Sequence, residues 1–503
     1  MPGKTGSRKS RAVDGSGQVA LPLDTSATSR ARTVGDLVSV GAVVFRDPAP
    51  DRIPVGSLLL SQFLVTHGLV WVDDIRKLIR GLCWDGYVAR YLPSIKPAFH
   101  PAGIVSLIWL GHMLGRTSLR QMEDLARTDL RAWWLTGGVM PDYSTLCRFM
   151  LRHQDDLTEA SFEDLTRQIV RALGSKSAEL CIDGTVVQAA AARMRQYKQE
   201  AATAAASEAR TAADAAPGNK TLAAKATHCE NLLAIVKARN AERRSTGRKP
   251  EAAVSPSEPE AVVQPLKRGA GFAPSYRPSA AANADRIITA KEVEATNEVR
   301  QVARLLDQSQ RVLDERVQTV MLDAGYNSAE VLHATEQRGI EMLCPEGTAA
   351  GSDESWTKDN AKFGKDRFEY DDKLDVYICP QGRVLSFARN CKPYGTIPGY
   401  VGYKSEDCSG CPLAGQCLSK PGVQRTIKRY AHDADKLALR LKMQRPEVRE
   451  RYKKRQGCIE PVHSEQKRVQ GMTRFRRRGL AKVRLEYSLH CAAHNLRRFV
   501  VLR

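Results

Sequence analysis

Three acidic residues have the types and surroundings that metal-dependent chemistry on phosphodiesters requires. Asp183 and Asp323 each follow a short apolar run, and Glu460 lies in the basic C-terminal segment. The runs, 180–182 and 320–322, are expected to be buried strands, whose ends can converge although they are far apart in sequence. Two Mg²⁺ ions about 4 Å apart, held by carboxylates, can activate an attacking oxygen and stabilise a leaving one. The alternative is structural: a turn-forming aspartate after a strand, or a glutamate favoured by a helix dipole.

Four cysteines are spaced as the ligands of a zinc ion would be. Cys379 lies in YICPQG, and the segment DCSGCPLAGQC supplies Cys408, Cys411 and Cys417. A CxxC pair with two further thiolates can hold one Zn²⁺ tetrahedrally, and such a closed site is structural. Cys391 is a spare candidate. The alternative is a set of reduced thiols in a loop.

The net charge of +21 is unevenly placed along the chain. Residues 425–503 hold 23 Lys and Arg against 7 Asp and Glu, a balance of +16. A concentrated basic surface favours a polyanion, because neutralising phosphates releases condensed counterions. The alternative is a solvated helical face. The side chains expected to contact DNA are Lys453, Lys454, Arg474, Arg476, Arg477 and Arg478.

The chain is expected to divide into an arm, a helical domain and an α/β domain. Residues 1–55 are rich in Ser, Gly, Arg and Pro and predict a flexible basic arm. Apolar residues at helical spacing predict an all-helical domain over 56–174. Two segments interrupt the α/β domain, which covers 175–503. The Ala-rich segment 195–265 is expected to lie outside any sheet, and the polar segment 345–430 has short β-like pieces and the cysteines.

The surroundings of Glu460 predict a helix boundary. Gly457 could end one helix, and Pro461 fits the first turn of the next, which would place Glu460 at a helix start. Glu460 and Lys467 are seven residues apart and would share a helix face. Lys467 could then contact the phosphate beside a metal-bound carboxylate.

Several classes of protein are excluded by missing signals. No run of about 18 apolar residues exists, so a membrane span is not expected. The start, MPGKTGSRKSRAV, lacks the apolar core of a signal peptide, and we expect a cytoplasmic protein. No GxxxxGK[ST] motif occurs, so a nucleotide cofactor is not expected.

Four blocks of the sequence together resemble DDE transposases of bacterial insertion sequences. Three are IDGTVVQAAA, LDAGYNSAEVL and a long C-terminal block that begins YKKRQGCIEPVHSEQKR. The C-terminal block resembles that family's Tyr-Arg-Glu-Lys signature, with Tyr452, Arg455, Glu460 and Lys467 at its positions. The fourth block, FHPAGIVSLIWLGHMLGRTSLRQMEDL and its continuation, resembles the family's InsH-type N-terminal domain.

This resemblance implies a fold, an activity and partners. The catalytic domain would be RNase H-like, with Mg²⁺ or Mn²⁺ at Asp183, Asp323 and Glu460. The enzyme would bind terminal inverted repeats, cleave DNA and join it to a target, as a homodimer associated with the bacterial nucleoid. Two alternatives stay open: a decayed transposase that only binds DNA, and an RNase H-like nuclease without strand transfer.

Overall fold

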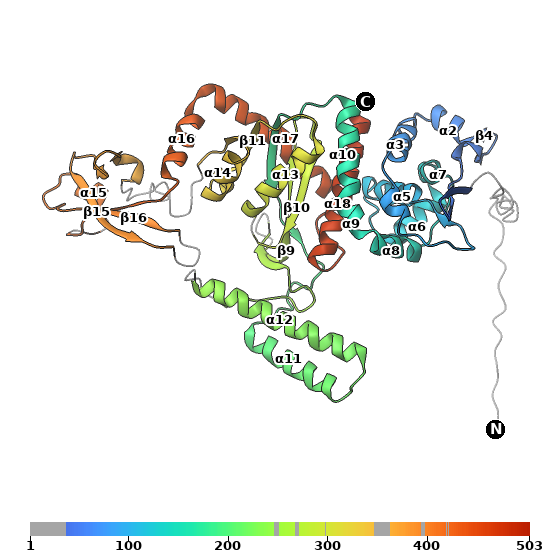
Figure 1. The fold of residues 1–503 in the computed structure, drawn as a ribbon, viewed down its shortest axis with the longest axis horizontal. Helices are drawn as coiled ribbons and strands as arrows, with labels where there is room; N and C mark the ends of the chain where they lie inside the picture. The colour runs from blue at the N-terminus through green and yellow to red at the C-terminus, as the bar shows by residue number, and fades with distance from the viewer. Residues whose placement is uncertain are drawn as a thin grey trace, which may run out of the picture.

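The structure is a computed structural model that describes residues 37–245, 251–266, 271–296, 298–346, 363–393, 398–418, 420 and 422–503. These residues form an elongated body of mixed α/β structure (Figure 1). Helices lie at one end, a mixed sheet in the middle and a smaller β-rich part at the other end, and a two-helix arm projects from the body. No helix in these ranges is long and apolar enough to cross a membrane.

The central sheet contains both antiparallel and parallel strands. Its main strands follow the order β10 (Ile288–Glu294), β9 (Phe272–Ala282), β6 (Glu179–Gly184), β11 (Thr319–Met321) and β12 (Glu341–Leu343). Strand β9 is antiparallel to β10 and β6, whereas β6, β11 and β12 are parallel. Helix α13 (Val302–Val312) leads from β10 into β11, and α14 (Ala329–Glu336) connects β11 with β12. The strands expected at 180–182 and 320–322 are therefore confirmed.

The two faces of the sheet bury different residues, because successive side chains of a strand point to opposite faces. Leu180 and Ile182 of β6 pack with α13 and α14 on one face. Cys181 of β6 packs on the other face with α17 (Pro446–Arg468) and α18 (Leu480–Leu502). Asp183 lies two residues beyond Cys181, so the same alternation directs its carboxylate toward α17.

Helices between residues 60 and 173 form the N-terminal part of the body. They are α2 (Leu60–Thr66), α3 (Trp71–Arg80), α4 (Asp85–Val88), α5 (Pro101–Met113), α6 (Leu119–Thr128), α7 (Leu130–Thr136), α8 (Tyr143–Arg152), α9 (Gln154–Thr158) and α10 (Ala160–Leu173). Helix α5 is apolar nearly all round and is buried on every side, where it packs against α18. At the start of α6, the Ser118 hydroxyl accepts a hydrogen bond from the Gln121 amide, as an N-cap residue does.

The arm and the all-helical domain both differ from expectation. Residues 37–55 were expected in the flexible arm, but they contain β1 (Leu37–Val40), β2 (Val43–Arg46) and β3 (Pro54–Val55). Strand β2 pairs with β5 (Ala98–Phe99), and β3 pairs with β4 (Leu58–Leu59), so short strands also occur within 56–174. The buried ring of Phe45, which contacts Tyr91 and His100, anchors this segment to the helices. Residues 1–36 of the expected arm lie outside the described residues.

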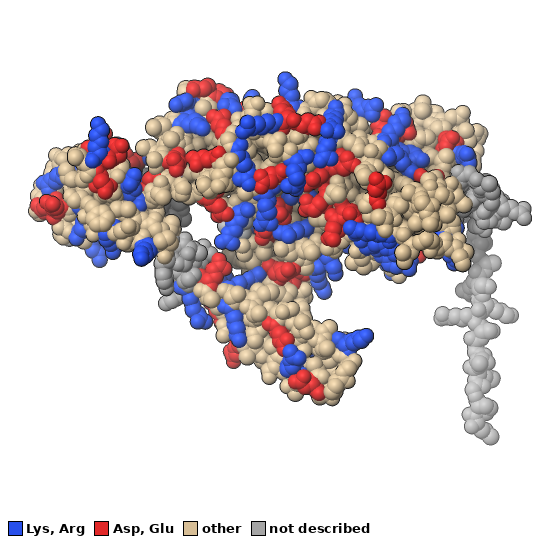
Figure 2. All heavy atoms as spheres, in the orientation of Figure 1, with Lys and Arg blue, Asp and Glu red and all other residues tan. Residues whose placement is uncertain are grey.

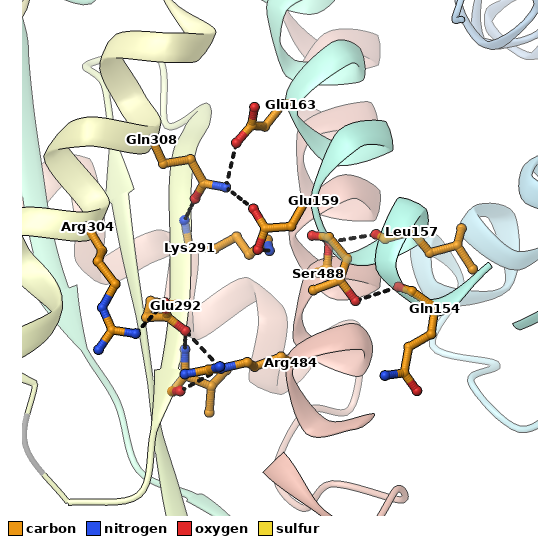
Figure 3. A network of polar contacts seen from close by, with 12 residues as sticks. Gln154, Leu157, Glu159, Glu163, Lys291, Glu292, Arg304, Gln308, Arg484 and Ser488 are labelled. Atoms are coloured by element: carbon orange, nitrogen blue, oxygen red, sulfur yellow. Dashed lines mark hydrogen bonds and ion pairs between the residues drawn. The ribbon is translucent and has the colours of Figure 1, made fainter. Parts of the chain in front are cut away.

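A network of polar contacts joins the N-terminal helices to the sheet (Figure 3). Gln308 of α13 donates to the Glu159 carboxylate at the start of α10, at 3.2 Å, and accepts from the Lys291 amide of β10, at 2.8 Å. Ser488 of α18 donates to the Leu157 carbonyl of α9, at 3.0 Å. One apolar core also runs from the N-terminal helices through α18 to the sheet. The helices and the sheet therefore form a single packed body.

The Ala-rich segment forms the projecting arm. Helices α11 (Gln199–Asp214) and α12 (Lys220–Ser245) pack together through small residues, with Ala202 of α11 buried beside Leu232 and Val236 of α12. The expectation that 195–265 lies outside any sheet is wrong at its end. Strand β8 (Val262–Pro265) pairs with β9 at the edge opposite β7 (Val187–Gln188), because the long strand β9 extends beyond β10 and offers free backbone groups there.

Residues 363–430, which we term the cysteine module, form a separate antiparallel sheet. Its strands are β13 (Glu369–Asp371), β14 (Val376–Ile378), β15 (Val384–Cys391), β16 (Tyr400–Ser405) and β17 (Thr426–Arg429), paired in chain order. A short helix, α15 (Ala414–Cys417), lies between β16 and β17. The module continues into α16 (Asp433–Gln444) and then α17. The β-like pieces expected in 345–430 are thus present.

Helix α17 is continuous, so the expected helix boundary at Gly457 and Pro461 is wrong. Proline inside a helix removes one hydrogen bond to the carbonyl four residues earlier, here that of Gly457. That carbonyl accepts a hydrogen bond from Arg286 Nε instead, at 3.0 Å. A tertiary contact therefore replaces the lost helix bond. Glu460 lies in the middle of α17 and not at the start of a helix.

Candidate active site and cysteine cluster

The sheet places Asp183 and Asp323 side by side. The register of the parallel pair β6 and β11 aligns Cys181 with Met321. Continued by two residues, it aligns Asp183 with Asp323 across strands that lie about 4.8 Å apart. Asp323 also caps the short 3-10 helix η4 (Ala324–Tyr326) by accepting the Gly325 amide at 2.8 Å, which fixes one of its two carboxylate oxygens.

A buried arginine of α17 pairs with the first aspartate. Arg455 Nη2 lies 3.3 Å from Asp183 Oδ1, and the arginine side chain is only 10% exposed. Burial raises the pKa of Asp183 to about 6, although Arg455 lowers it, and the charges of Asp323 and Glu298 raise it further. Asp183, Asp323 and Glu298 thus lie near one another at the ends of the strands, as the register of β6 and β11 and the position of Glu298 beside Gly184 also require.

Three more polar side chains of α17 reach the same strand ends. The Tyr452 hydroxyl donates to the Leu322 carbonyl at 2.9 Å, next to Asp323. His463 Nε2 lies 3.3 Å from the Asp183 carbonyl oxygen. Lys467 Nζ donates to the Thr185 hydroxyl at 2.5 Å and to the Val186 carbonyl at 3.2 Å, just beyond Asp183.

Glu460 lies beside this row of contacts, with an exposed side chain. Arg455 and His463 both contact Asp183, and Glu460 lies between them in the helix. Arg455 and His463 are about 12 Å apart along the helix axis, at 1.5 Å rise per residue, and the Glu460 backbone lies within this stretch. The structure thus brings Asp183, Asp323 and Arg455 together, while Glu460 occupies the solvent side of the same stretch of helix.

Sequence reasoning missed Glu298. A side chain at Gly184 would come within 2.4 Å of Glu298 Oε2, so this carboxylate lies directly over the end of β6. Arg277 pairs with Glu298 at 3.0 Å. Nearby, Tyr326 is fully buried, and its hydroxyl has no hydrogen-bond partner within the described chain. The available signal was an acidic residue soon after residues 288–294, which form β10, a signal of the same kind as the one that identified the two aspartates.

The four cysteines of the predicted zinc site line one pocket of the cysteine module. Cys379 follows β14, Cys408 and Cys411 lie in the turn after β16, and Cys417 ends α15. Burial raises the pKa of the Cys417 thiol, and the other three thiols raise it further. Cys391 does not line this pocket. Across the described ranges, no three His, Cys, Asp or Glu side chains already surround a point at metal-ligand spacing.

The basic residues expected to contact DNA fall into two groups. Lys453, Lys454, Arg474, Arg476 and Arg478 are exposed, although Arg474 and Arg478 also donate to backbone carbonyls of residues 189–191. Arg477 instead turns inward, and its guanidinium contacts Met150 Sδ at 3.0 Å. In the view of Figure 2, Lys and Arg alternate with Asp and Glu over the central body. The excess charge is therefore interspersed with acidic side chains on this face.

Two protein families match the chain. Residues 378–500 match the family described as Transposase DDE domain, and residues 72–152 match the family described as Transposase domain (DUF772). The first match includes α17 and all four cysteines of the pocket, and the second covers most of the N-terminal helices. A comparison with curated proteins gave no match.

Proposed function

We propose that the protein cleaves DNA at the ends of its insertion sequence and joins those ends to a target. The two family matches, which indicate a DDE transposase of insertion-sequence type, support this proposal. One observation carries the proposal: Asp183 and Asp323 end adjacent parallel strands, and α17 presents Arg455, Tyr452 and Lys467 to the same ends.

We propose that the sheet belongs to an RNase H-like catalytic domain. Support comes from its architecture, in which the antiparallel strands β6, β9 and β10 lead into the parallel strands β11 and β12, with helices packed on both faces. In such a sheet the carboxyl ends of the parallel strands lie at one edge. Asp183 and Asp323, which are distant in sequence, can therefore act together there in DNA cleavage.

The donor set fits a hard divalent cation such as Mg²⁺ or Mn²⁺. The groups at the strand ends are carboxylates of Asp183 and Asp323, with Glu460 on the adjacent stretch of α17, and Mg²⁺ prefers oxygen ligands of this kind. When bound, such ions activate the attacking oxygen and stabilise the leaving oxygen. A side-chain rotation of Glu460 toward the sheet completes the proposed set.

The other residues of α17 have positioning roles in this proposal. Arg455 keeps Asp183 charged and holds it against the helix. Tyr452 ties α17 to the end of β11 through the Leu322 carbonyl. Lys467, whose ammonium lies beside Thr185, is the proposed contact to a phosphate of the bound strand.

We propose double-stranded DNA, as terminal inverted repeats and as target, for the partner, and a homodimer for the complex that holds both ends. The exposed cations Lys453, Lys454, Arg476 and Arg478 are the proposed phosphate contacts. A decayed protein that only binds DNA is not favoured, because Asp183 and Asp323 are still aligned at the sheet edge.

The test is cleavage of DNA that flanks the coding region. Wild-type protein should cut this DNA when Mg²⁺ or Mn²⁺ is present, join the cut ends to a second DNA, and do neither in excess chelator. Asp183→Asn should bind the same DNA without cutting it, while the matched surface variant Asp372→Asn should cut normally. Cleavage without joined products would favour a nuclease, and full activity in chelator would refute the proposal.

A further inference from the structure

The cysteine module has the features of a structural zinc site, and this inference does not depend on the proposed reaction. Among the described residues of the module, the buried core consists of seven side chains: Phe368, Tyr377, Leu385, Tyr403, Cys417, Leu418 and Ile427. A module of fewer than about 70–80 residues with so small a core usually needs a disulfide or a metal ion to be stable. All described cysteines are free thiols.

The first turn of the pocket has the geometry of a metal-binding knuckle. In the segment 379–382, the Gly382 amide donates to the Cys379 carbonyl at 2.8 Å, and Gly382 has φ +75°, which glycine adopts without strain. The Arg383 amide then donates to Cys379 Sγ at 3.3 Å. A backbone amide directed at sulfur stabilises a thiolate, the form that binds zinc.

The second turn supplies two more sulfurs in a similar way. Cys408 and Cys411 flank Gly410, whose φ of +64° lets the chain reverse between them. The Ser405 hydroxyl lies 2.8 Å from Cys408 Sγ. The Ala414 amide donates to the Cys411 carbonyl at 3.0 Å, which starts the short helix that ends at Cys417.

Two arginines supply positive charge at the same pocket. Arg383 and Arg425 both line it. Arg425 donates to the Cys417 carbonyl at 3.1 Å, yet its Nε is buried without a hydrogen-bond partner in the described chain. Four thiolates around Zn²⁺ carry a net charge of −2, and these guanidinium groups would offset it. With reduced neutral thiols, the half-buried guanidinium of Arg425 would have carbonyl partners at Cys417 and Phe363 but no negative charge to balance it at the pocket.

From these observations we propose that Cys379, Cys408, Cys411 and Cys417 bind one structural Zn²⁺. Thiolates suit zinc rather than magnesium, so this site and the carboxylate site select different ions. Binding requires the sulfurs to move inward from the pocket wall and release protons, and its free energy then contributes to the folding of the module. Because the module continues into α16 and α17, the ion stabilises the segment that leads to Glu460.

Elemental analysis of the purified full chain tests the proposal. Wild-type protein should hold about one zinc per chain after desalting, and Cys408→Ser with Cys411→Ser should reduce this to under about a tenth. Cys391→Ser is the matched control, because Cys391 lies in the same module but not in the pocket, and it should retain the zinc. Asp183→Asn with Asp323→Asn should also retain it, which excludes zinc held by the carboxylates.

Cobalt gives a second measurement on the wild-type chain, so that misfolding of a variant cannot decide the result. Co²⁺ added to zinc-depleted wild-type protein should give the intense absorption of a tetrahedral tetrathiolate site, and one equivalent of Zn²⁺ should abolish it. A wild-type chain that binds neither ion, or a Cys391→Ser variant that loses zinc as the double variant does, would overturn the assignment.

Discussion

The carboxylate site and the cysteine pocket are positioned by different structures. Asp183 and Asp323 follow neighbouring strands of a central sheet whose two faces are both covered, so backbone pairing alone holds them together. The cysteines come from two turns and a one-turn helix above a core of seven residues. The sheet edge does not depend on a cation, whereas the proposed zinc ion would stabilise the pocket.

The largest expected effect is on the rate of DNA cleavage, when a carboxylate at the sheet edge is removed without loss of stability. Asp323→Asn should lower the rate of DNA cleavage by at least about 10²–10³-fold, because it removes charge where the reaction needs it. The thermal unfolding midpoint should change little, since asparagine can still cap η4. Single-turnover cleavage and calorimetry measure the two effects. A variant that cuts normally would remove Asp323 from the site.

Removing metal ions should affect the two regions differently. Chelation with EDTA followed by dialysis should make residues 363–430 sensitive to limited proteolysis, while the central body stays resistant. Zn²⁺ should restore protection and Mg²⁺ should not, because only zinc suits thiolate ligands. Mass spectrometry of the fragments locates the cuts. Equal protection with and without zinc would show that the module folds unaided.

Glu298 tests whether the carboxylate site extends beyond the three acidic residues of the signature. Glu298→Gln should reduce cleavage by about 10-fold, the lower end of the range for groups that orient metal ligands, and should leave DNA binding unchanged. Its exposed counterpart Glu336→Gln, on α14, should have no effect. A Glu298 variant with normal cleavage would restrict this carboxylate to its ion pair with Arg277.

The sequence allowed the sheet-edge aspartates to be predicted because their signal is local. A buried strand needs an apolar run, and a polar residue after it must lie at the sheet edge, as Asp183 and Asp323 do. The continuity of α17 could not be predicted in this way. The missing bond at Pro461 is compensated by Arg286, which is 175 positions earlier in the sequence (461 − 286), and no local rule describes such a contact.

The inward orientation of Arg477 and the pairing of β8 escaped prediction for the same reason. Arg477 belongs to a run of three arginines, and nothing in that run shows that the middle one contacts Met150 of a distant helix. Strand β8 forms because β9 is long enough to accept it. The cysteine spacing, in contrast, was informative, since the two turns that position the sulfurs are encoded within a few residues of Cys379 and Cys408.

The arginine run offers a comparison between exposed cations and a half-buried one. Replacing Arg476 and Arg478 with Ala should weaken binding to all DNA and lower the slope of log affinity against log salt by about one unit per lost phosphate contact. Arg477→Ala should leave that slope unchanged and instead destabilise the fold by on the order of 1–3 kcal/mol, through lost packing. Salt titrations and denaturant unfolding distinguish the two outcomes, and a slope that falls with Arg477→Ala would place this side chain on the DNA.

An effect on stability of similar size, but dependent on pH, is expected at the contact that anchors α17 to α18 outside both sites. Burial would raise the pKa of Glu465, but His494 and Arg497 lower it to about 2, from an ordinary value of 4.5. A depressed carboxylate pKa stabilises the folded state above the unfolded pKa, and this stabilisation disappears as pH falls from about 4.5 to 2. Glu465→Gln should therefore cost on the order of 1–3 kcal/mol of unfolding free energy at pH 7. The difference from wild type should shrink steadily below pH 4.5, and a difference that stays constant down to pH 2 would show that the charge of Glu465 does not stabilise this contact.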